Sequence, residues 1–186
     1  VAAVRSADAV IFSDYNYGAA DAEIFEAVRM AAAERQIPIL VDSRFRLQKF
    51  CGASSATPNQ DEVEQILGPG FGDEACERLR DELGLESLLV TNGNKGMTLI
   101  ERGREPQHID AVGSDQAVDV TGAGDTVIAA FALGLASGLG HFDAAKLANH
   151  AGGIVVMKKG TAAVTPDELI ASVNSVATNE ILSSNA

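Results

Sequence analysis

The segment Asp119-Val120-Thr121-Gly122-Ala123-Gly124-Asp125 leads directly into an apolar stretch, residues 126–133, with the character of a helix. Two glycines and an alanine at a helix start leave backbone N–H groups free and keep side-chain bulk away from an anion. The helix dipole adds partial positive charge at the same point. Asp125 stands in the first turn, where it could take a proton from a hydroxyl that attacks a phosphoryl group bound on those amides. The alternative is that Asp125 only caps its helix and that Gly122 and Gly124 serve a tight turn.

Two common phosphate-binding loops do not fit this segment. A Walker A loop ends in Gly-Lys followed by Ser or Thr, whereas Gly124 is followed by Asp125. A dinucleotide-binding fingerprint needs a third glycine three residues after Gly124, and that position is Val127. If the segment binds phosphate, it does so in a different type of site.

The composition bounds the class of protein. The chain has 186 residues, of which 46% are apolar, enough for one domain with a full core. A net charge of −12 argues against nucleic acid or an acidic membrane as the main partner, although backbone amides and Mg²⁺ can still bind a polyanion locally. No apolar run is long enough to cross a bilayer, and no secretory leader precedes the first strand. Since Cys51 and Cys76 build no disulfide framework, we expect a cytoplasmic protein.

Short apolar runs alternate with amphipathic segments along the chain. Two of the runs end in an acid, Asp14 and Asp42, and the ends of strands are where α/β sheets usually place their chemistry. The expected strands cover residues 9–13, 39–41, 87–91, 97–101 and 107–109, and the expected helices cover residues 21–36, 60–67, 71–83, 126–137, 143–157 and a last one from Pro166. This alternation predicts one α/β domain, residues 1–186, with helices on both faces of a parallel or mixed sheet.

Two further segments allow both a local and a functional interpretation. Asn59 and Glu62 lie three apart at a predicted helix start, so both side chains can face one spot, but the same spacing forms a capping box. The run Thr91-Asn92-Gly93-Asn94-Lys95-Gly96 joins two predicted strands, and hairpin geometry alone explains its glycines. Spacing does not decide between the interpretations in either segment.

In this order, the motifs resemble those of the ribokinase (PfkB) family of carbohydrate kinases. The segment from Asp119 to Thr126 resembles the second signature of that family. The other matching segments are Thr57-Pro58-Asn59-Gln60-Asp61-Glu62 (its Asn-x-x-Glu motif), the run from Thr91 to Gly96, and Ala148-Asn149-His150-Ala151-Gly152-Gly153 ahead of Lys159-Gly160-Thr161. The resemblance covers residues 9–173 and implies a ribokinase-like three-layer α/β/α sandwich. We expect the N-terminal portion and the sugar-covering lid of the family to lie outside these 186 residues. We therefore expect the nucleotide-binding and catalytic part of one kinase domain.

The resemblance implies an ATP-dependent phosphotransferase whose acceptor is a hydroxyl of a sugar or sugar phosphate. Asp125 would be the general base for that hydroxyl. Gly122, Ala123 and Gly124 would supply the amides of an anion hole for the phosphoryl group in flight, which suits a reaction that relies on positioning and charge neutralisation. The expected partner is a small-molecule sugar, and a homodimer is compatible with the resemblance.

The resemblance also implies cofactor positions. Asn59 and Glu62 would organise Mg²⁺ and the phosphates of ATP, largely through water, because Mg²⁺ keeps part of its hydration shell. Residues lining the ATP cleft would be Thr91, Gly93, Gly96 and Asn149. Asp119 and the carbonyl of Thr121, beside the loop at Gly160, match a monovalent-cation (K⁺) site of some members.

Within the family, the chain looks most like the kinase domain of the bifunctional heptose-7-phosphate kinase/heptose-1-phosphate adenylyltransferases. This likeness rests on Ser13-Asp14-Tyr15, Thr57-Pro58-Asn59 and Asp125-Thr126-Val127-Ile128. Two loops depart from that pattern. Tyr17 stands where those kinases carry a lysine, and Asp42-Ser43-Arg44 stands in place of Asp-Pro-Lys. Since both loops face the acceptor side in the family, D-glycero-D-manno-heptose 7-phosphate is one acceptor to test among others.

Other functions remain open at this stage. The acceptor of such a kinase could be fructose, ribose or a nucleoside. A non-catalytic nucleotide-binding module is a second alternative, because part of the acceptor site is expected to lie outside this chain. A methylpyrimidine-kinase-type relative shares the fold and a similar anion hole, but its signature places other residues around the base. Binding of ATP with Mg²⁺, and turnover on a panel of sugars, would separate these alternatives.

Overall fold

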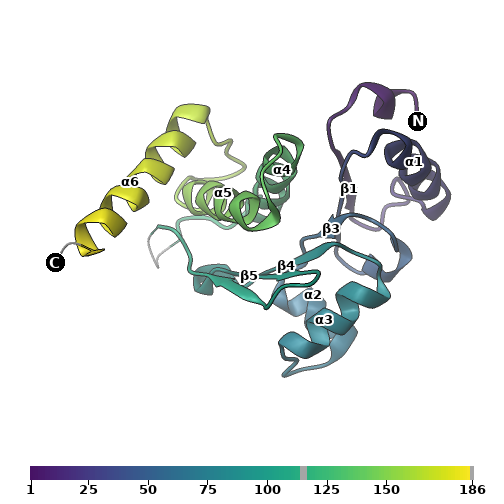
Figure 1. Cartoon of the computed structure of the whole chain (residues 1–186), viewed down its shortest axis with the longest axis horizontal. Coiled ribbons are helices and arrows are strands. Elements are labelled where there is room, and N and C mark those ends of the chain that lie inside the picture. The colour runs from purple at the N-terminus through teal and green to yellow at the C-terminus, as the bar shows by residue number, and fades with distance from the viewer. Residues whose placement is uncertain (114–116, 185–186) are drawn as a thin grey trace.

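The computed structural model describes residues 1–113 and 117–184. Within these residues the chain forms three layers, in which one six-stranded sheet carries helices on both faces (Figure 1). This is the predicted α/β/α sandwich.

The strands lie in the sheet in their order along the chain, from β1 to β6. Four successive strands run parallel, and β5 and β6 each pair antiparallel with the strand before them. Their bounds are β1 (Val10–Asp14), β2 (Ile39–Ser43), β3 (Ser55–Ala56), β4 (Ser87–Thr91), β5 (Met97–Glu101) and β6 (Gln107–Ile109). Because the first four strands are parallel, their carboxyl ends meet at one edge, where α/β sheets place their sites.

Strand β3 is absent from the predicted strands. It has two residues, Ser55 and Ala56, and both are fully buried between β2 and β4. The Ser55 hydroxyl lies 2.8 Å from that of Ser87 on β4, so each satisfies the other inside the sheet. Two small residues without an apolar run carry no strand periodicity, which is why the sequence pattern missed this strand.

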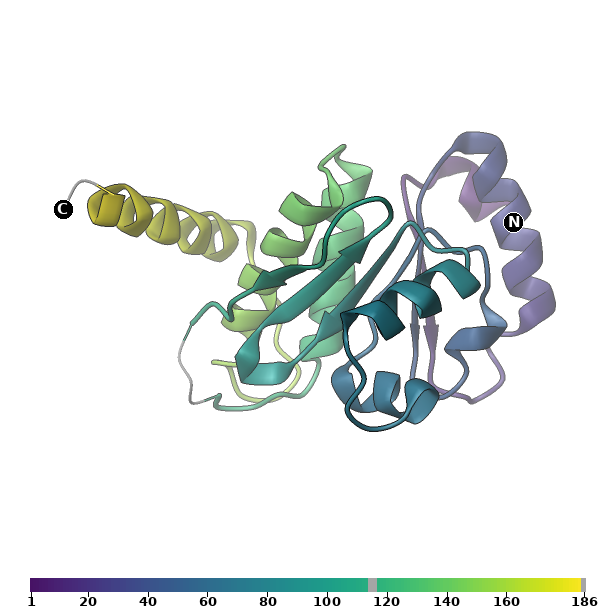
Figure 2. The same ribbon diagram turned by 60° about the horizontal axis from the view of Figure 1, so that its bottom comes forward.

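The helices separate into two groups around the sheet. One face is covered by α1 (Ala22–Arg35), α2 (Gln60–Leu67) and α3 (Asp73–Glu82), and the other by α4 (Ala123–Ala136) and α5 (His141–Val155). Successive right-handed crossovers that add each parallel strand on the same side put their helices on one face. The second face is left for the segment after β6, and this is where α4 and α5 lie in both views (Figure 2).

Successive side chains along each strand point to opposite faces of the sheet, so that apolar strands contribute to a core on each face. On β4, Leu88 faces the core with α1, α2 and α3, while Leu89 faces the core with α4 and α5. The small residues of α4 and α5 allow close contact, since a Cβ at Gly134 would lie 2.9 Å from the Cβ of Ala144.

Helix α4 starts three residues earlier than predicted, at Ala123, with Gly122 as the N-cap. The glycine-rich segment is therefore the first turn itself. A first turn tolerates glycine because its N–H groups need no partner within the helix.

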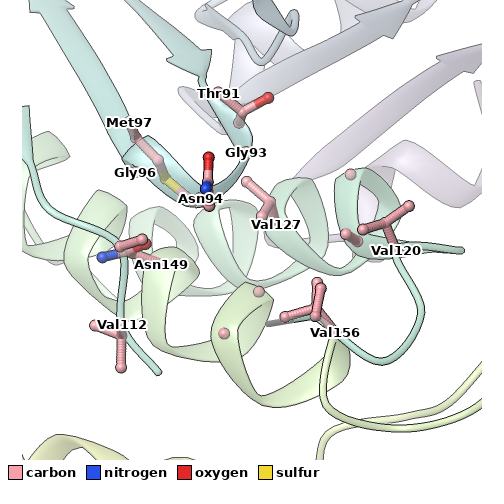
Figure 3. A pocket seen from close by; sticks show the side chains of 16 residues that line it. Thr91, Gly93, Asn94, Gly96, Met97, Val112, Val120, Val127, Asn149 and Val156 are labelled. Atoms are coloured by element: carbon pink, nitrogen blue, oxygen red, sulfur yellow. The ribbon is translucent and has the colours of Figure 1, made fainter. Parts of the chain in front are cut away.

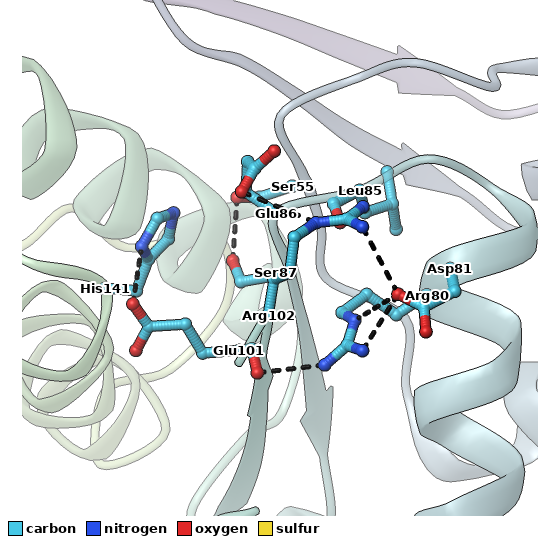
Figure 4. A network of polar contacts seen from close by, with 9 residues as sticks. All are labelled: Ser55, Arg80, Asp81, Leu85, Glu86, Ser87, Glu101, Arg102 and His141. Carbon is cyan, nitrogen blue, oxygen red and sulfur yellow. Dashed lines mark hydrogen bonds and ion pairs between the residues drawn. The ribbon is translucent and has the colours of Figure 1, made fainter. Parts of the chain in front are cut away.

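Polar contacts tie the layers together at the end of β5. Nδ1 of His141, at the start of α5, lies 3.3 Å from the Glu101 carboxylate. On the opposite face, the buried Arg80 of α3 donates to the Glu101 carbonyl at 2.9 Å and pairs with Asp81 at 2.8 Å (Figure 4). This network joins one helix of each group to the same strand.

The last helix, α6 (Pro166–Ser184), packs on α5 and carries the chain end away from the sheet (Figure 1). As expected, Pro166 is its first residue, where a missing N–H costs nothing. None of the described helices combines the length and the apolar character needed to cross a membrane.

Candidate functional site

The carboxyl ends of the parallel strands and the first turn of α4 surround an acidic cavity of about 600 Å³. Its acids come from four different elements, since Asp14 ends β1, Asp42 lies near the end of β2, Glu62 is in the first turn of α2 and Asp125 is in the first turn of α4. The remaining lining consists of Tyr15, Arg44, Thr57, Asn59, Thr91 and residues 120–124. The strand-end acids and the glycine-rich segment thus share one site.

The first turn of α4 presents free backbone donors to this cavity. Gly122 has a left-handed backbone (φ +77°), and its carbonyl accepts hydrogen bonds from the Thr126 amide and hydroxyl at 3.0 and 2.9 Å. The Ala123 amide donates to the Val120 carbonyl at 3.2 Å. The amides of Gly122, Gly124 and Asp125 have no hydrogen-bond acceptor within residues 1–113 and 117–184. A role for the Ala123 amide in an anion hole therefore requires that its turn bond opens.

The Asp125 carboxylate forms a hydrogen bond across the cavity. It accepts a hydrogen bond of 2.6 Å from the Tyr15 hydroxyl, which comes from the loop after β1. The N-cap of α4 is Gly122, and no side chain caps the helix. The interpretation of Asp125 as a simple helix cap is therefore not supported.

Burial and neighbouring charges perturb the carboxylates of the cavity. Burial, with the negative charges of Glu62 and Asp125, raises the pKa of Asp42 to about 6. Burial also raises the pKa of Glu62, against the hydrogen bonds from Asn59. Clustered acids with raised pKa values are typical of a site that receives a positive charge or a proton.

The predicted capping box at Asn59 and Glu62 is present. The Asn59 side chain accepts from the Glu62 amide at 2.9 Å, and the Glu62 carboxylate accepts from the Asn59 amide at 3.0 Å. Asn59 also forms a β-bridge with Thr91, which sets the start of α2 beside the end of β4. The local interpretation is therefore confirmed. The functional one stays compatible with it, because both side chains also line the acidic cavity.

A second cavity, of about 200 Å³, adjoins the first at the start of α4 (Figure 3). The two cavities share four lining residues, namely Thr91, Val120, Ala123 and Gly124. The second cavity is mostly apolar, with walls from the β4–β5 turn, from α4 and from α5. Its apolar side chains are those of Met97, Ala111, Val112, Ala117, Val120, Ala123, Val127 and Val156. All four residues predicted to line the ATP cleft, Thr91, Gly93, Gly96 and Asn149, line this cavity.

Two of these residues also shape the cavity wall. The Asn149 side-chain amide, on α5, donates to the Asp110 carbonyl at 2.7 Å and so holds the segment after β6 against α5. Gly96 has φ +90°, and a Cβ there would lie 2.0 Å from the Ile109 carbonyl oxygen. Hairpin geometry therefore explains Gly96 only in part, because the close approach of the Ile109 backbone also excludes any side chain.

The two acids predicted to bind metal ions, Glu62 and Asp119, lie in different surroundings. Glu62 faces the acidic cavity, where carboxylate oxygens fit a hard cation such as Mg²⁺. Asp119 instead ties two loops together, since its carboxylate accepts from the amides of Thr121 and Gly160, each at 2.9 Å. These bonds, that of Thr121 foremost, lower the pKa of Asp119. In the part of the chain that the structure describes, no three His, Cys, Asp or Glu side chains are grouped to hold a metal alone. An ion here would need water or phosphate oxygens as further ligands.

A buried ion pair holds the two loops in which the sequence departs from the heptose kinases. Asp14 is 3% exposed, and its carboxylate accepts hydrogen bonds from Arg46 at 3.0 Å and from Ser43 at 2.8 Å. Arg46 also donates to the Ala20 carbonyl. Burial alone would raise the pKa of Asp14, but hydrogen bonds from Arg46, the Asn16 amide and Ser43 outweigh burial and lower it.

We expect Arg46→Ala to lower the free energy of unfolding by about 3 kcal/mol, because it leaves the Asp14 carboxylate buried without its partner. Since the folded pKa of Asp14 is depressed, this stabilisation exists above its unfolded pKa of about 4 and is lost as the pH falls through the folded value. Urea unfolding at neutral and acidic pH measures both effects. Lys49→Ala, at an exposed basic residue of the same loop, is the control and should change stability by less than about 0.5 kcal/mol.

The sequence alone did not assign roles to Tyr15, Asp42 and Arg44, which the structure places in the acidic cavity. Asp42 carried a signal, as an acid at the end of a buried strand. Tyr15 and Arg44 belong to loops that the resemblance places on the acceptor side, but the direction of their side chains is decided only in the folded chain.

Comparisons with known proteins agree with this geometry. A family model described as "pfkB family carbohydrate kinase" matches residues 1–168. Among curated relatives, the bifunctional protein HldE of Chromohalobacter salexigens is 46% identical over 174 residues, and that of Trichlorobacter lovleyi is 41% identical over 173 residues. Each alignment covers 90% of this chain but 36% and 35% of the relative. The chain thus spans about a third of the length of these relatives.

Solved structures share the fold. A ribokinase from Arabidopsis thaliana, complexed with ribose and ATP, superposes with a TM-score of 0.77 at 24% identity, covering 91% of this chain and 56% of that one. Phosphofructokinase-2 from Escherichia coli, in complex with potassium, gives the same TM-score at 17% identity, covering 91% and 57%. At these identities the likeness shows the fold, and the ligands belong to those proteins.

Proposed function

Because the chain belongs to the pfkB family of carbohydrate kinases, we propose that it is the nucleotide-binding and catalytic part of an ATP-dependent sugar kinase. The single observation that carries the proposal is the junction of two cavities at the first turn of α4. The apolar cavity fits the adenine ring and the acidic cavity fits the acceptor. The free amides between them fit the phosphoryl group that passes from one to the other.

In this proposal Asp125 is the general base. The acceptor oxygen attacks the γ-phosphorus of ATP, the bond from that phosphorus to the β,γ-bridging oxygen breaks, and ADP leaves. The acceptor proton passes to the Asp125 carboxylate. The Gly122 and Gly124 amides stabilise the charge on the transferring group, and the Ala123 amide joins them if its bond to Val120 opens.

Two metal ions, Mg²⁺ and K⁺, belong to the proposed site. Glu62 and Asn59 would hold Mg²⁺ through water and the phosphates of ATP, and the nearby Asp42 would add negative charge. Mg²⁺ would neutralise phosphate charge when it is bound. Asp119 and the Thr121 carbonyl would hold K⁺ beside Gly160. The carboxylate would then keep its two backbone hydrogen bonds and use its remaining lone pairs.

For the acceptor we propose a sugar phosphate, with D-glycero-D-manno-heptose 7-phosphate as the first compound to test. Support comes from the identity of 41% and 46% to two HldE proteins and from Arg44, a cation on the wall of the acidic cavity that could pair with a phosphate. Tyr17 and Ser43, at positions where the heptose kinases carry other residues, favour a different acceptor such as fructose, ribose or a nucleoside.

The test measures ATP binding and turnover on the same chain. We expect calorimetry to detect binding of ATP with Mg²⁺, and a coupled assay to detect ADP release only when the matching acceptor of the panel is present. The panel is heptose 7-phosphate, fructose, ribose and adenosine, each against a no-acceptor control. Binding of ATP without turnover on any acceptor would favour a nucleotide-binding module instead. Absence of ATP binding would contradict the proposal altogether.

A further inference from the structure

Tyr15 lies directly against the candidate base. Its hydroxyl donates a hydrogen bond of 2.6 Å to Oδ1 of Asp125, across 110 positions of sequence. The residue is 45% exposed and lines the acidic cavity. This contact is the one that an acceptor hydroxyl has to make with a general base before it gives up its proton.

The loop that carries Tyr15 is anchored on both sides of the residue. The preceding residue, Asp14, is buried and bonded to Arg46 and Ser43. The following residue, Asn16, has a left-handed backbone (φ +61°), and its amide donates to the Asp14 carboxylate at 2.9 Å. The anchors fix the backbone and leave the ring free at its exposed edge. The Tyr15 side chain can therefore swing from Asp125 without unfolding the loop.

Tyr15 is itself a poor acceptor of the phosphoryl group. The hydrogen bond to Asp125, more than burial, raises the pKa of the Tyr15 phenol. At neutral pH the phenol thus remains a neutral donor that covers the carboxylate. Water cannot occupy the same position on Oδ1 while the phenol is there.

We propose that Tyr15 occupies the acceptor-hydroxyl position on Asp125 until a sugar hydroxyl displaces it, and so limits the hydrolysis of ATP by water. The inference rests on the proposed function, because it takes Asp125 as the base. The reaction that Tyr15 limits is attack of a water oxygen on the γ-phosphorus of ATP. The bond to the β,γ-bridging oxygen breaks, ADP leaves, and the proton of the water goes to Asp125.

The kinetic test uses Tyr15→Phe, which keeps the ring and removes the hydroxyl. Without acceptor, we expect ATP hydrolysis to rise about tenfold or more, since a hydrogen bond to a charged group is lost. With acceptor, its KM should fall while the KM for ATP stays unchanged. Lys49→Ala, at an exposed residue that lines neither cavity of the site, should change neither value. An acceptor KM that rises in Tyr15→Phe, or hydrolysis that stays at the wild-type rate, overturns the inference.

A spectroscopic test separates this inference from the proposed function. The chain has two tyrosines and no tryptophan, so Tyr15 is the only strong fluorophore of a Tyr17→Phe protein. A carboxylate that accepts a hydrogen bond from a phenol quenches its fluorescence. We expect the emission to rise when Asp125→Ala is added, and also when the accepted sugar binds to Tyr17→Phe alone.

The outcomes distinguish two failures. If no variant turns over ATP with any acceptor, the proposed function fails, while the emission still shows whether Tyr15 contacts Asp125 and whether a sugar displaces it. If emission is the same with and without Asp125→Ala, the contact is absent and the inference fails even for an active kinase. If the sugar binds and is phosphorylated without any change in emission, Tyr15 is not displaced and the inference also fails.

Discussion

Replacing Asp125 by asparagine is expected to lower the rate of ATP-dependent phosphorylation by a factor of about 10²–10⁴. The amide has nearly the same size as the carboxylate but cannot accept the proton of the acceptor hydroxyl. ATP binding should survive, because the apolar cavity and the free amide of Gly124 are unchanged. Steady-state kinetics with the matching acceptor, together with calorimetry of ATP binding, measures both expectations.

Asp143→Asn is a matched control for this variant. Asp143 also lies in the first turn of a helix, α5, but pairs with the exposed Lys146 at 2.9 Å and lines neither cavity of the site. It should retain turnover within about twofold of the wild type, since an exposed pair of this kind contributes little. Near-normal turnover in Asp125→Asn would remove Asp125 as the base. An equal loss of ATP affinity and turnover would make its role structural.

The second large effect is expected from Gly96→Ala, which should lower the free energy of unfolding by about 3 kcal/mol or more. A Cβ at Gly96 would lie 2.0 Å from the Ile109 carbonyl oxygen and 2.7 Å from the Ala111 amide nitrogen. The Ile109 carbonyl cannot move without disturbing the pairing of Ile109 on β6 with Met97 on β5. Overpacking of this kind costs about 1–3 kcal/mol, and the backbone conformation of Gly96 (φ +90°, ψ −136°), which favours glycine, adds about 1–3 kcal/mol for alanine.

Gly103→Ala distinguishes these two costs. Gly103 lies in the same part of the sheet, between β5 and β6, with φ +73° and no atom within 4 Å of its Cβ position. In urea unfolding, the Gly103→Ala variant should lose only the backbone contribution, about 1–2 kcal/mol of the free energy of unfolding. Gly96→Ala should also weaken ATP binding, because a Cβ there displaces Ala111, which lines the apolar cavity, and disturbs the neighbouring Asp110 carbonyl that Asn149 holds. Equal stability losses in both variants would contradict the steric argument.

Most of the secondary structure follows from local pattern. The bounds of β4, β5, β6 and α2 are as predicted, because apolar periodicity and capping act within a few residues. The Asn59–Glu62 capping box is confirmed for the same reason, since both partners lie on one helix turn. The two-residue β3 was missed, because its place in the sheet depends on β2 and β4 and not on its own sequence.

The candidate site also combines local features, which the sequence predicts, with long-range contacts, which it does not predict. The glycine-rich start of α4 is a local feature, and its free amides were expected from the sequence. Two side-chain contacts of the site were not expected from the sequence. Tyr15 reaches Asp125 across 110 positions, and Arg46 reaches Asp14 across 32 positions.

The amino-acid sequence by itself therefore determined every strand except β3, the helices, and the small-residue helix start between Asp119 and Asp125, for which phosphate binding is a prediction. Hydrophobic periodicity, small residues and helix-start amides act over short spans of chain, and they are visible as spacing. Only the tertiary structure decided that the Asp125 carboxylate faces a tyrosine hydroxyl and lies where an acidic and an apolar cavity meet. Those contacts depend on sheet register and on the direction of loops, which no local spacing specifies.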